Sequence, residues 1–226
     1  GSTSLVMYMD QLKSLDPLKD DIHLPGWDAS YTQAEVRDLI KAYSALGEEG
    51  LWRNLEKFLK KIIPVAESCG VTMAIHPDDP PYPIFGIPRI ITNERNIDRM
   101  LNIVNSPANS LCFCTGSLGC AAFNDIPKMV RKYSEMGRIA FMHIRQVKLL
   151  EDGSFEERGH LSKDGSLDMY EIVKALVDTG FDGYVRPDHG RMIWGESGKP
   201  GYGLFDRALG AAYINGLFEA VEKEKK

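Results

Sequence analysis

Four side chains that can bind a metal ion stand at or just after the ends of four short apolar runs. They are His76, Cys114, His143 and Asp188. Two imidazoles, a thiolate and a carboxylate are together suited to a divalent metal ion. Taken singly, such a histidine is more often a hydrogen-bonded structural residue, such a cysteine a small buried hydrophobe, and such an aspartate a turn residue. Their repetition over four successive runs favours the metal site.

Two further residues could transfer protons beside such a site. His189 directly follows Asp188, and Gly190 allows a turn through which both side chains can face one site. The imidazole of His189 would then stay free as a proton donor or acceptor, although a surface-turn histidine has comparable weight. Tyr202 lies in the glycine-flanked loop 199–203, where its hydroxyl could fold over the site or simply anchor the loop.

Four more residues in or near these loops are candidates to bind a carboxylate substrate. They are Arg145, His160, Arg186 and Arg191. Arginine suits this task because its guanidinium can hold both oxygens of a carboxylate. As isolated residues, however, such groups are more often solvated or paired with acidic side chains on the surface.

Alternating patterns of apolar residues predict the scaffold that must position these side chains. Four apolar runs suit buried strands, namely Val71–Ile75, Ser110–Cys114, Arg138–Met142 and Gly183–Arg186. Helical spacing predicts helices with apolar stripes over Val36–Tyr43, Leu51–Ala66, Ile97–Val104, Ile126–Tyr133 and Met169–Val177, and a last helix over about Leu204–Val221. Glycines are expected to end four of these helices, at Gly47, Gly70, Gly137 and Gly180, and Ser166 or Asp168 to cap one.

Strand and helix alternate four times, which is typical of parallel strands joined by crossover helices. We therefore expect an α/β fold, either a doubly wound sheet or a barrel. In both architectures active sites form at the carboxyl ends of the strands, where the four candidate ligands would meet. Residues 1–30 are predicted to be irregular, residues 77–88 with five prolines to form a rigid loop, and residues 1–226 to form one domain.

Composition excludes several classes of protein. The chain has 226 residues and a formal charge of −5, without the basic stripe of a nucleic-acid binder. No run is apolar enough to span a membrane, and no signal peptide is visible after Gly1 and Ser2, so a cytoplasmic location is expected. The four cysteines do not form a disulfide pattern. Sequence motifs for dinucleotides, nucleotides and serine hydrolases are absent.

Several stretches resemble the mannonate dehydratase family, and the resemblance extends from Ser2 to the last predicted helix. The matching stretches are His76–Pro81, Phe85–Thr92, Phe113–Ser117, Arg186–Gly190 and Pro200–Gly203. The resemblance implies a TIM (β/α)8 barrel related to xylose isomerase, with this chain supplying its C-terminal half of about four βα units. Such a half barrel implies a fragment or an apolar face covered by something else, such as a second copy, and a homodimer or larger homo-oligomer is expected.

The resemblance also implies a reaction. Members of the family remove water from D-mannonate to give 2-dehydro-3-deoxy-D-gluconate in hexuronate (glucuronate) catabolism, using Mn²⁺, with Fe²⁺ also associated. Their metal ligands fall on the four residues already chosen here, and their acid–base pair falls on His189 and Tyr202. The ligand set by itself would bind Zn²⁺ more tightly than Mn²⁺. Other interpretations are a different metal-dependent sugar-acid dehydratase, a sugar isomerase on the same barrel, or an inactive metal-binding fragment.

Overall fold

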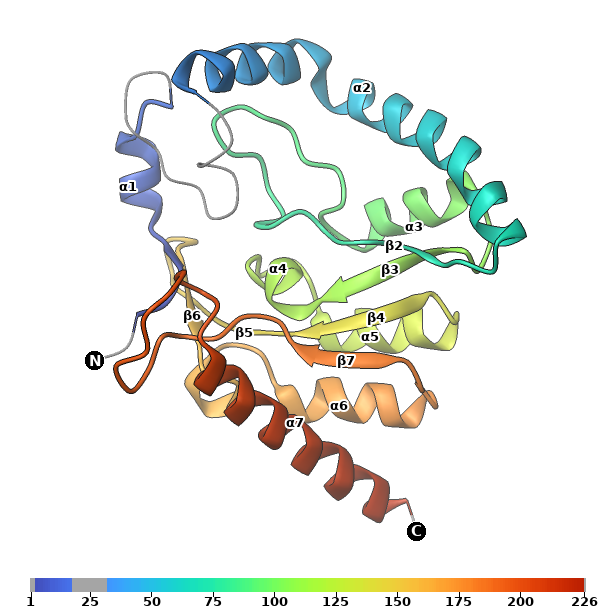
Figure 1. Ribbon diagram of the computed structural model, residues 1–226, viewed down its shortest axis with the longest axis vertical. Helices are drawn as coiled ribbons and strands as arrows, with labels where there is room; N and C mark the ends of the chain where they lie inside the picture. The colour runs from blue at the N-terminus through green and yellow to red at the C-terminus, as the bar shows by residue number, and fades with distance from the viewer. Residues whose placement is uncertain (1–2, 18–31, 226) are drawn as a thin grey trace.

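The computed structural model describes residues 3–17 and 32–225, and these residues form a parallel sheet and a smaller antiparallel sheet (Figure 1). The parallel sheet has four strands in the order β2-β3-β4-β7. Their bounds are β2 Met73–Ile75, β3 Asn109–Cys114, β4 Ile139–Ile144 and β7 Tyr184–Pro187. Every neighbouring pair is parallel. The four predicted strands and their parallel arrangement are therefore confirmed.

Helices connect and cover these strands as the apolar spacing predicted. The principal helices are α2 Gln33–Ser68, α3 Glu94–Ile103, α5 Ile126–Glu135, α6 Met169–Asp178 and α7 Leu204–Glu224, with shorter helices α4 Thr115–Gly119 and η1 Ser162–Asp164. The two helices predicted on either side of Gly47 form one long element that is broken there, because Gly47 has a left-handed φ of 66°. Asp168 rather than Ser166 caps α6, since its carboxylate accepts the N–H groups of Tyr170 and Glu171.

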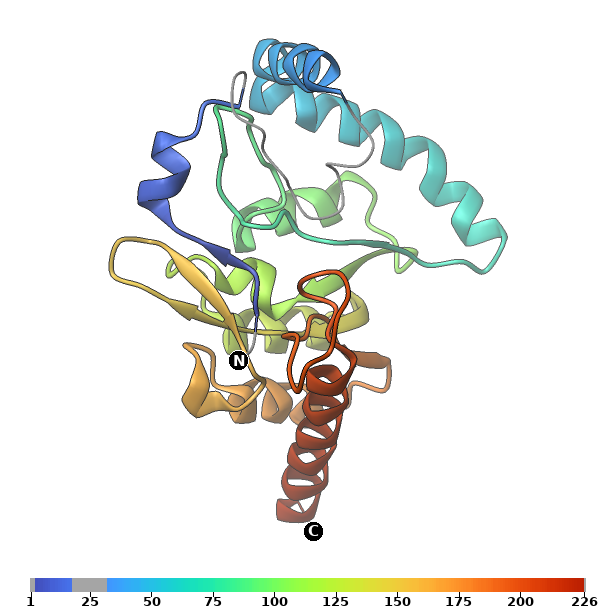
Figure 2. The same ribbon diagram turned by 60° about the vertical axis from the view of Figure 1, so that its left-hand side comes forward.

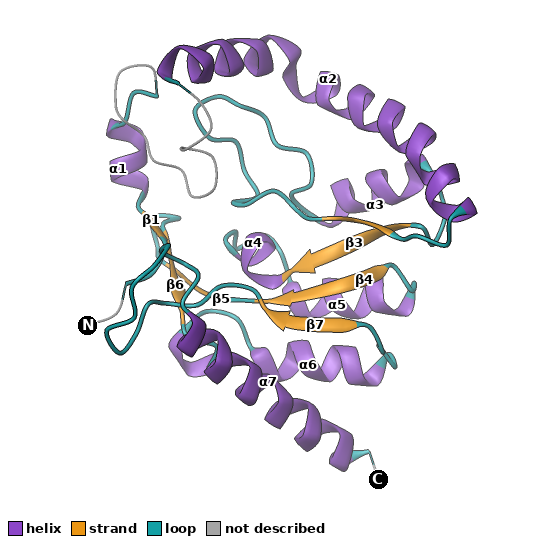
Figure 3. Ribbon diagram, viewed as in Figure 1, coloured by secondary structure: helices purple, strands orange, loops and turns teal. Residues whose placement is uncertain are grey.

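The two faces of the parallel sheet have different neighbours. Leu111 and Phe113 of β3 belong to the main apolar core, which also contains side chains of α5, α6 and α7. These three helices pack side by side in that order (Figure 3). Because side chains alternate along a strand, Cys114 points to the opposite face. There the strand register places Cys114 beside His143 and His143 beside Arg186 in one row.

The antiparallel sheet was not predicted. It has the order β1-β6-β5, with bounds β1 Val6–Met7, β5 Gln146–Leu149 and β6 Phe155–Arg158. Strands β5 and β6 form a hairpin directly after β4, and β1 lies beside β6 (Figure 2). The prediction that residues 1–30 are irregular is wrong for residues 3–17, which hold β1 and helix α1 Met9–Ser14. The rest of that prediction, on residues 1–2 and 18–30, lies outside the described residues.

Two negative findings concern the described part of the chain. None of its helices combines the length and apolar character needed to cross a membrane. All four cysteines are free thiols. Cys112 is buried within β3.

Candidate active site

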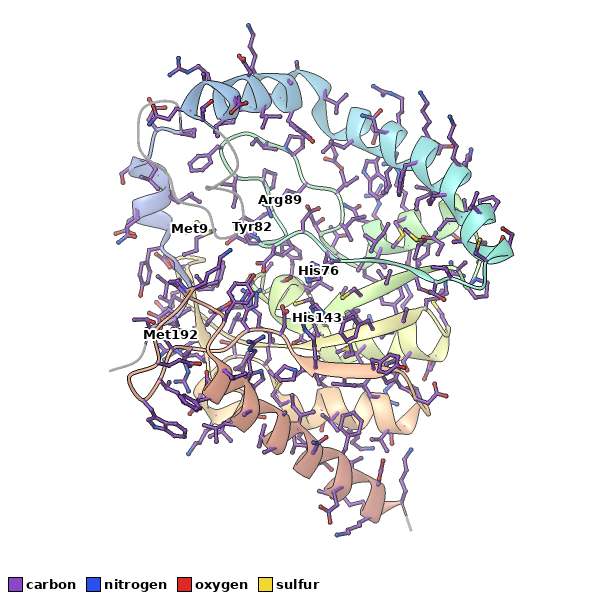
Figure 4. The ribbon with its side chains drawn as sticks, in the orientation of Figure 1. Met9, His76, Tyr82, Arg89, His143 and Met192 are labelled. Atoms are coloured by element: carbon purple, nitrogen blue, oxygen red, sulfur yellow. The ribbon has the colours of Figure 1, made fainter. Side chains whose placement is uncertain are left out.

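The four predicted metal ligands converge at the carboxyl ends of the parallel strands. One ligand atom from each of His76, Cys114, His143 and Asp188 lies within 4.8 Å of every other. Figure 4 shows His76 and His143 close together there, and their ring centroids are 5.4 Å apart. The convergence expected from parallel neighbouring strands is thus what the structure contains.

Backbone geometry explains why each ligand reaches this point. Cys114 ends β3 and is the N-cap of helix α4. Its sulfur accepts a hydrogen bond from the backbone N–H of Ser117 at 3.5 Å. His143 lies directly opposite Cys114 in the register of β3 and β4. Asp188 follows β7 and continues its ladder, since its backbone N–H donates to the carbonyl of Ile144 at 3.2 Å. His76 comes immediately after β2 and lies at the exposed rim of the cluster.

Charges within the cluster are strongly coupled. His143 Nδ1 lies 3.2 Å from Asp188 Oδ1, and the Cys114 sulfur lies 3.6 Å from Asp188 Oδ2. Burial acts to lower the pKa of His143, but its contacts with Asp188 and Cys114 raise that pKa to about 9. Burial acts in the opposite sense on Asp188, yet the neighbouring histidines and Arg186 hold the pKa of its carboxyl well below the usual range.

The residues present fit a divalent cation. Nε2 of His143 is buried and has no hydrogen-bond partner, so a cation would satisfy an otherwise orphaned nitrogen. Nδ1 of His76 donates to the carbonyl of Pro77 at 2.7 Å, which leaves its Nε2 unprotonated and able to bind metal. The mixed nitrogen, sulfur and oxygen set is one that first-row divalent ions accept.

His189 and Tyr202 lie next to this cluster on two chain segments that are tied together. Nε2 of His189 is 3.6 Å from Asp188 Oδ2, and its ring centroid is 5.6 Å from that of Tyr202. The N–H of Gly190 donates to Gly201 at 3.0 Å, and the N–H of Gly203 donates back to Gly190 at 2.9 Å. These bonds hold the two candidate proton-transfer groups beside one another.

Arg145 is almost completely buried, with 4% of its side chain exposed. Its Nη1 pairs with Asp79, and its Nε lies 2.9 Å from Oε1 of Glu157. Burial acts to raise the pKa of Asp79, but the charge of Arg145 holds it below its usual value. The guanidinium is therefore engaged by two protein carboxylates, and the predicted contact of Arg145 with substrate stays a prediction.

The other three candidate substrate-binding residues have different surroundings. Arg186 is 45% exposed and donates to Asp188 Oδ1 at 2.9 Å, so it remains accessible beside the cluster. Arg191 is held by Asp206, which accepts its backbone N–H and two guanidinium N–H groups. His160 is buried with Nε2 at 3.1 Å from the carbonyl of Ile144. The contacts of Arg191 and His160 favour structural roles, and their contact with substrate stays a prediction.

Sequence reasoning missed Glu157 and Asp79, which join the site through Arg145 and His189. Glu157 lies between other charged residues of β6, a context typical of a solvated surface strand. Asp79 belongs to the conspicuous stretch after β2, where its position near His76 was a usable signal. Glu157 offered no such signal, because its place depends on the unpredicted hairpin.

A parallel α/β sheet with a His-Cys-His-Asp cluster at the carboxyl ends of its strands defines an α/β protein with a candidate metal centre. Comparison with known proteins makes this specific: the model of the D-mannonate dehydratase (UxuA) family matches residues 1–226, and the chain belongs to this family. It is 51% identical to the mannonate dehydratase of Streptococcus uberis over 226 residues, covering 100% of this chain and 65% of that protein. It is 52% identical to that of Oceanobacillus iheyensis over 222 residues, covering 98% and 63%.

Solved structures agree with the fold. The crystal structure of mannonate dehydratase from Streptococcus suis serotype 2 matches with a TM-score of 0.90 and 46% identity, covering 100% of this chain and 61% of that one. A D-tagatose 3-epimerase-like protein shares only the fold, with a TM-score of 0.56 and 16% identity, covering 98% of this chain and 78% of that one. The chain thus spans less than two thirds of these mannonate dehydratases. The predicted family and the predicted partial TIM barrel are confirmed.

Proposed function

We propose that this chain carries out the metal-dependent dehydration of D-mannonate to 2-dehydro-3-deoxy-D-gluconate, as a lyase of hexuronate catabolism. The observation that carries the proposal is the gathering of four ligand atoms within 4.8 Å. Membership of the D-mannonate dehydratase family supports the substrate. A cytoplasmic location and a homo-oligomeric state stay predictions, and sedimentation of the purified chain tests the second.

His76, Cys114, His143 and Asp188 would hold the cation, which is Mn²⁺ by family resemblance, with Fe²⁺ and Zn²⁺ as alternatives. When bound, a divalent cation supplies Lewis-acid stabilisation of the negative charge that develops on the substrate carboxylate. Arg186, accessible beside Asp188, would add a positive charge for the same carboxylate.

The proton transfers fall to the two residues beside the cluster. The phenolate oxygen of ionised Tyr202 takes the proton from C2 of mannonate, and the imidazolium of His189 gives the proton on its Nε2 to the departing 3-hydroxyl group, which leaves as water. The resulting enol becomes the 2-keto acid by proton transfer to C3. The reverse assignment, with His189 as base and Tyr202 as acid, uses the same two groups. The backbone hydrogen bonds that join Gly190 to Gly201 and Gly203 support this role, because they hold the two groups near one another.

The test measures formation of the 2-dehydro-3-deoxy acid from D-mannonate by this chain with added Mn²⁺, beside a chelated control. His189→Asn should keep the metal and lose turnover, whereas Asp188→Asn should lose the metal. Unchanged turnover in the His189 variant would remove this residue from the mechanism. Product from other sugar acids but not from D-mannonate would indicate a different dehydratase. A folded, metal-loaded chain that acts on none of them would contradict catalysis by this chain alone.

A further inference from the structure

Glu157 is a buried carboxylate whose position is fixed on both sides by backbone pairing. It lies in β6, where it pairs with Val147 of β5, and its backbone N–H donates to the carbonyl of Leu5 at 2.9 Å. Only 3% of its side chain is exposed. The hairpin therefore fixes this carboxylate next to His189.

One oxygen of Glu157 meets the proton-transfer histidine. Oε1 of Glu157 accepts the N–H of His189 Nδ1. A carboxylate can only accept hydrogen bonds, so Nδ1 keeps its proton: Nε2 is unprotonated in the neutral ring and carries the transferable proton in the imidazolium. Nε2 is the atom that faces Asp188, at 3.6 Å from Oδ2. The contact thus determines which nitrogen of His189 is available to a substrate at the metal cluster.

The carboxylate itself is held by Arg145. The Nε of Arg145 lies 2.9 Å from the same Oε1, and the other end of the guanidinium pairs with Asp79. A buried carboxylate without a cation would be costly, and this pairing compensates its charge. Asp79, Arg145, Glu157 and His189 therefore form one continuous chain of contacts that ends at the imidazole.

We propose that Glu157 is a positioning residue for the reaction: it fixes the tautomer and the orientation of His189. The inference rests on the proposed function for its kinetic part, and on geometry alone for its tautomer part. A carboxylate that orients a catalytic imidazole through Nδ1 is worth up to about 10⁴-fold in turnover in a serine-protease triad. Here the acceptor oxygen also forms an ion pair with Arg145 at 2.9 Å. An amide oxygen in its place keeps an acceptor for His189 and loses the charge.

Three variants separate positioning from structural support. Glu157→Leu removes the acceptor, and Glu157→Gln keeps an acceptor without the charge. The matched control is Glu156→Gln, because Glu156 is the adjacent residue of β6 and its carboxylate contacts Tyr8 and Arg158 instead. All three are made in this chain and their metal content is measured.

The first readout is independent of catalysis. ¹⁵N NMR of metal-free, histidine-labelled protein above pH 8, where an ordinary imidazole is neutral, reports the tautomer of His189. The His189→Asn variant identifies its signals. Wild type and Glu157→Gln should show a protonated Nδ1, with the Nδ1–H proton further downfield in wild type because its acceptor is charged. Glu157→Leu should lose this tautomer preference, and Glu156→Gln should match wild type.

The second readout is turnover with D-mannonate. Glu157→Leu should lower kcat by about 100-fold and Glu157→Gln by about 10-fold, with KM changed less than about threefold, because orientation of the proton-transfer group acts in the transition state. The proposal would be overturned if Glu157→Leu had the same kcat as wild type, or if His189 kept the same tautomer in this variant as in wild type. If Glu157→Leu does not fold, an Nδ1–H resonance identical in wild type and Glu157→Gln overturns it. If the wild-type chain has no turnover, the proposed function fails and the NMR result still decides the tautomer role.

Discussion

Asp206 links helix α7 to the loop that carries the proposed proton-transfer residues, and its removal should destabilise the fold measurably. Its carboxylate is buried, with 3% of the side chain exposed. It accepts the backbone N–H of Arg191 at 2.8 Å, the Nε–H at 2.9 Å and an Nη2–H at 3.0 Å. Because Arg191 directly follows Gly190, this contact fixes the segment between His189 and the start of α7.

The magnitude of the change in Asp206→Ala follows from these three bonds. Breaking a hydrogen bond to a charged group costs about 1.5–3 kcal/mol, so three independent losses would sum to roughly 4.5–9 kcal/mol. The side chain of Arg191 is 28% exposed, however, and water can replace much of what its guanidinium loses. We therefore expect about 3 kcal/mol, the lower end of the range for breaking a buried pair. For a domain of this size that corresponds to a fall in Tm of about 6–12 °C.

The assay is thermal unfolding followed by circular dichroism, with urea unfolding to obtain the free energy of unfolding. Asp206→Asn should lie between the variant and wild type, because its amide oxygen still accepts hydrogen bonds. Glu56→Ala, which removes one partner of an exposed pair with Lys60, is the control and should leave Tm nearly unchanged. A fall in Tm of less than about 3 °C for Asp206→Ala would show that the buried contact adds little and would refute the reasoning.

Three other outcomes follow from the same structure. Gly203→Ala should lower Tm strongly, because a Cβ there would lie 1.9 Å from the carbonyl oxygen of Arg191. Gly216 is an exposed residue of α7 where a Cβ meets nothing within 4 Å, so Gly216→Ala should stabilise the fold by about 1 kcal/mol; thermal melts compare the two variants. Asp188→Asn should weaken Mn²⁺ binding by at least about 10-fold, measured by calorimetry, and unchanged affinity would contradict its place in the cluster. Arg191 holds the pKa of Asp206 below its usual value, so the stability from this pair is complete above about pH 4 and is lost as pH falls toward the lowered pKa. The difference in free energy of unfolding between wild type and Asp206→Ala should therefore shrink in that range. A difference that stays constant with pH would contradict this prediction.

The parallel half of the fold could be predicted from local patterns because its signals are local. Each strand is a short apolar run, and each helix carries its own stripe and stop signal. Gly70, Gly137 and Gly180 all adopt the left-handed φ that their positions after apolar stripes required, at 65°, 63° and 71°. The antiparallel sheet has no comparable signal, because β1 is only two residues long and exists through pairing with residues about 150 positions away.

The candidate site divides in the same way. The metal cluster could be predicted because parallel strands bring their carboxyl ends together, so position along the chain was sufficient to place four ligands. The surroundings of Arg145 could not, because its two carboxylate partners lie 66 and 12 residues away and one of them is on the hairpin. An exposed arginine and a buried, paired one look alike in sequence, and only tertiary burial distinguishes them.

The two sheets make different contributions to the chemistry. The parallel sheet holds the ligands through backbone ladders, in which each ligand is fixed by its neighbour's register, as Cys114 is by His143. His189, the proposed proton-transfer histidine, has no such ladder, since it lies in the loop after β7. Its orientation must come from a side chain, and the hairpin inserted directly after β4 supplies that side chain as Glu157. A site that needs both fixed cation ligands and an oriented imidazole therefore requires the antiparallel sheet as well as the parallel strands. Loss of the contact between Glu157 and His189 should affect proton transfer while the cation ligands stay in place.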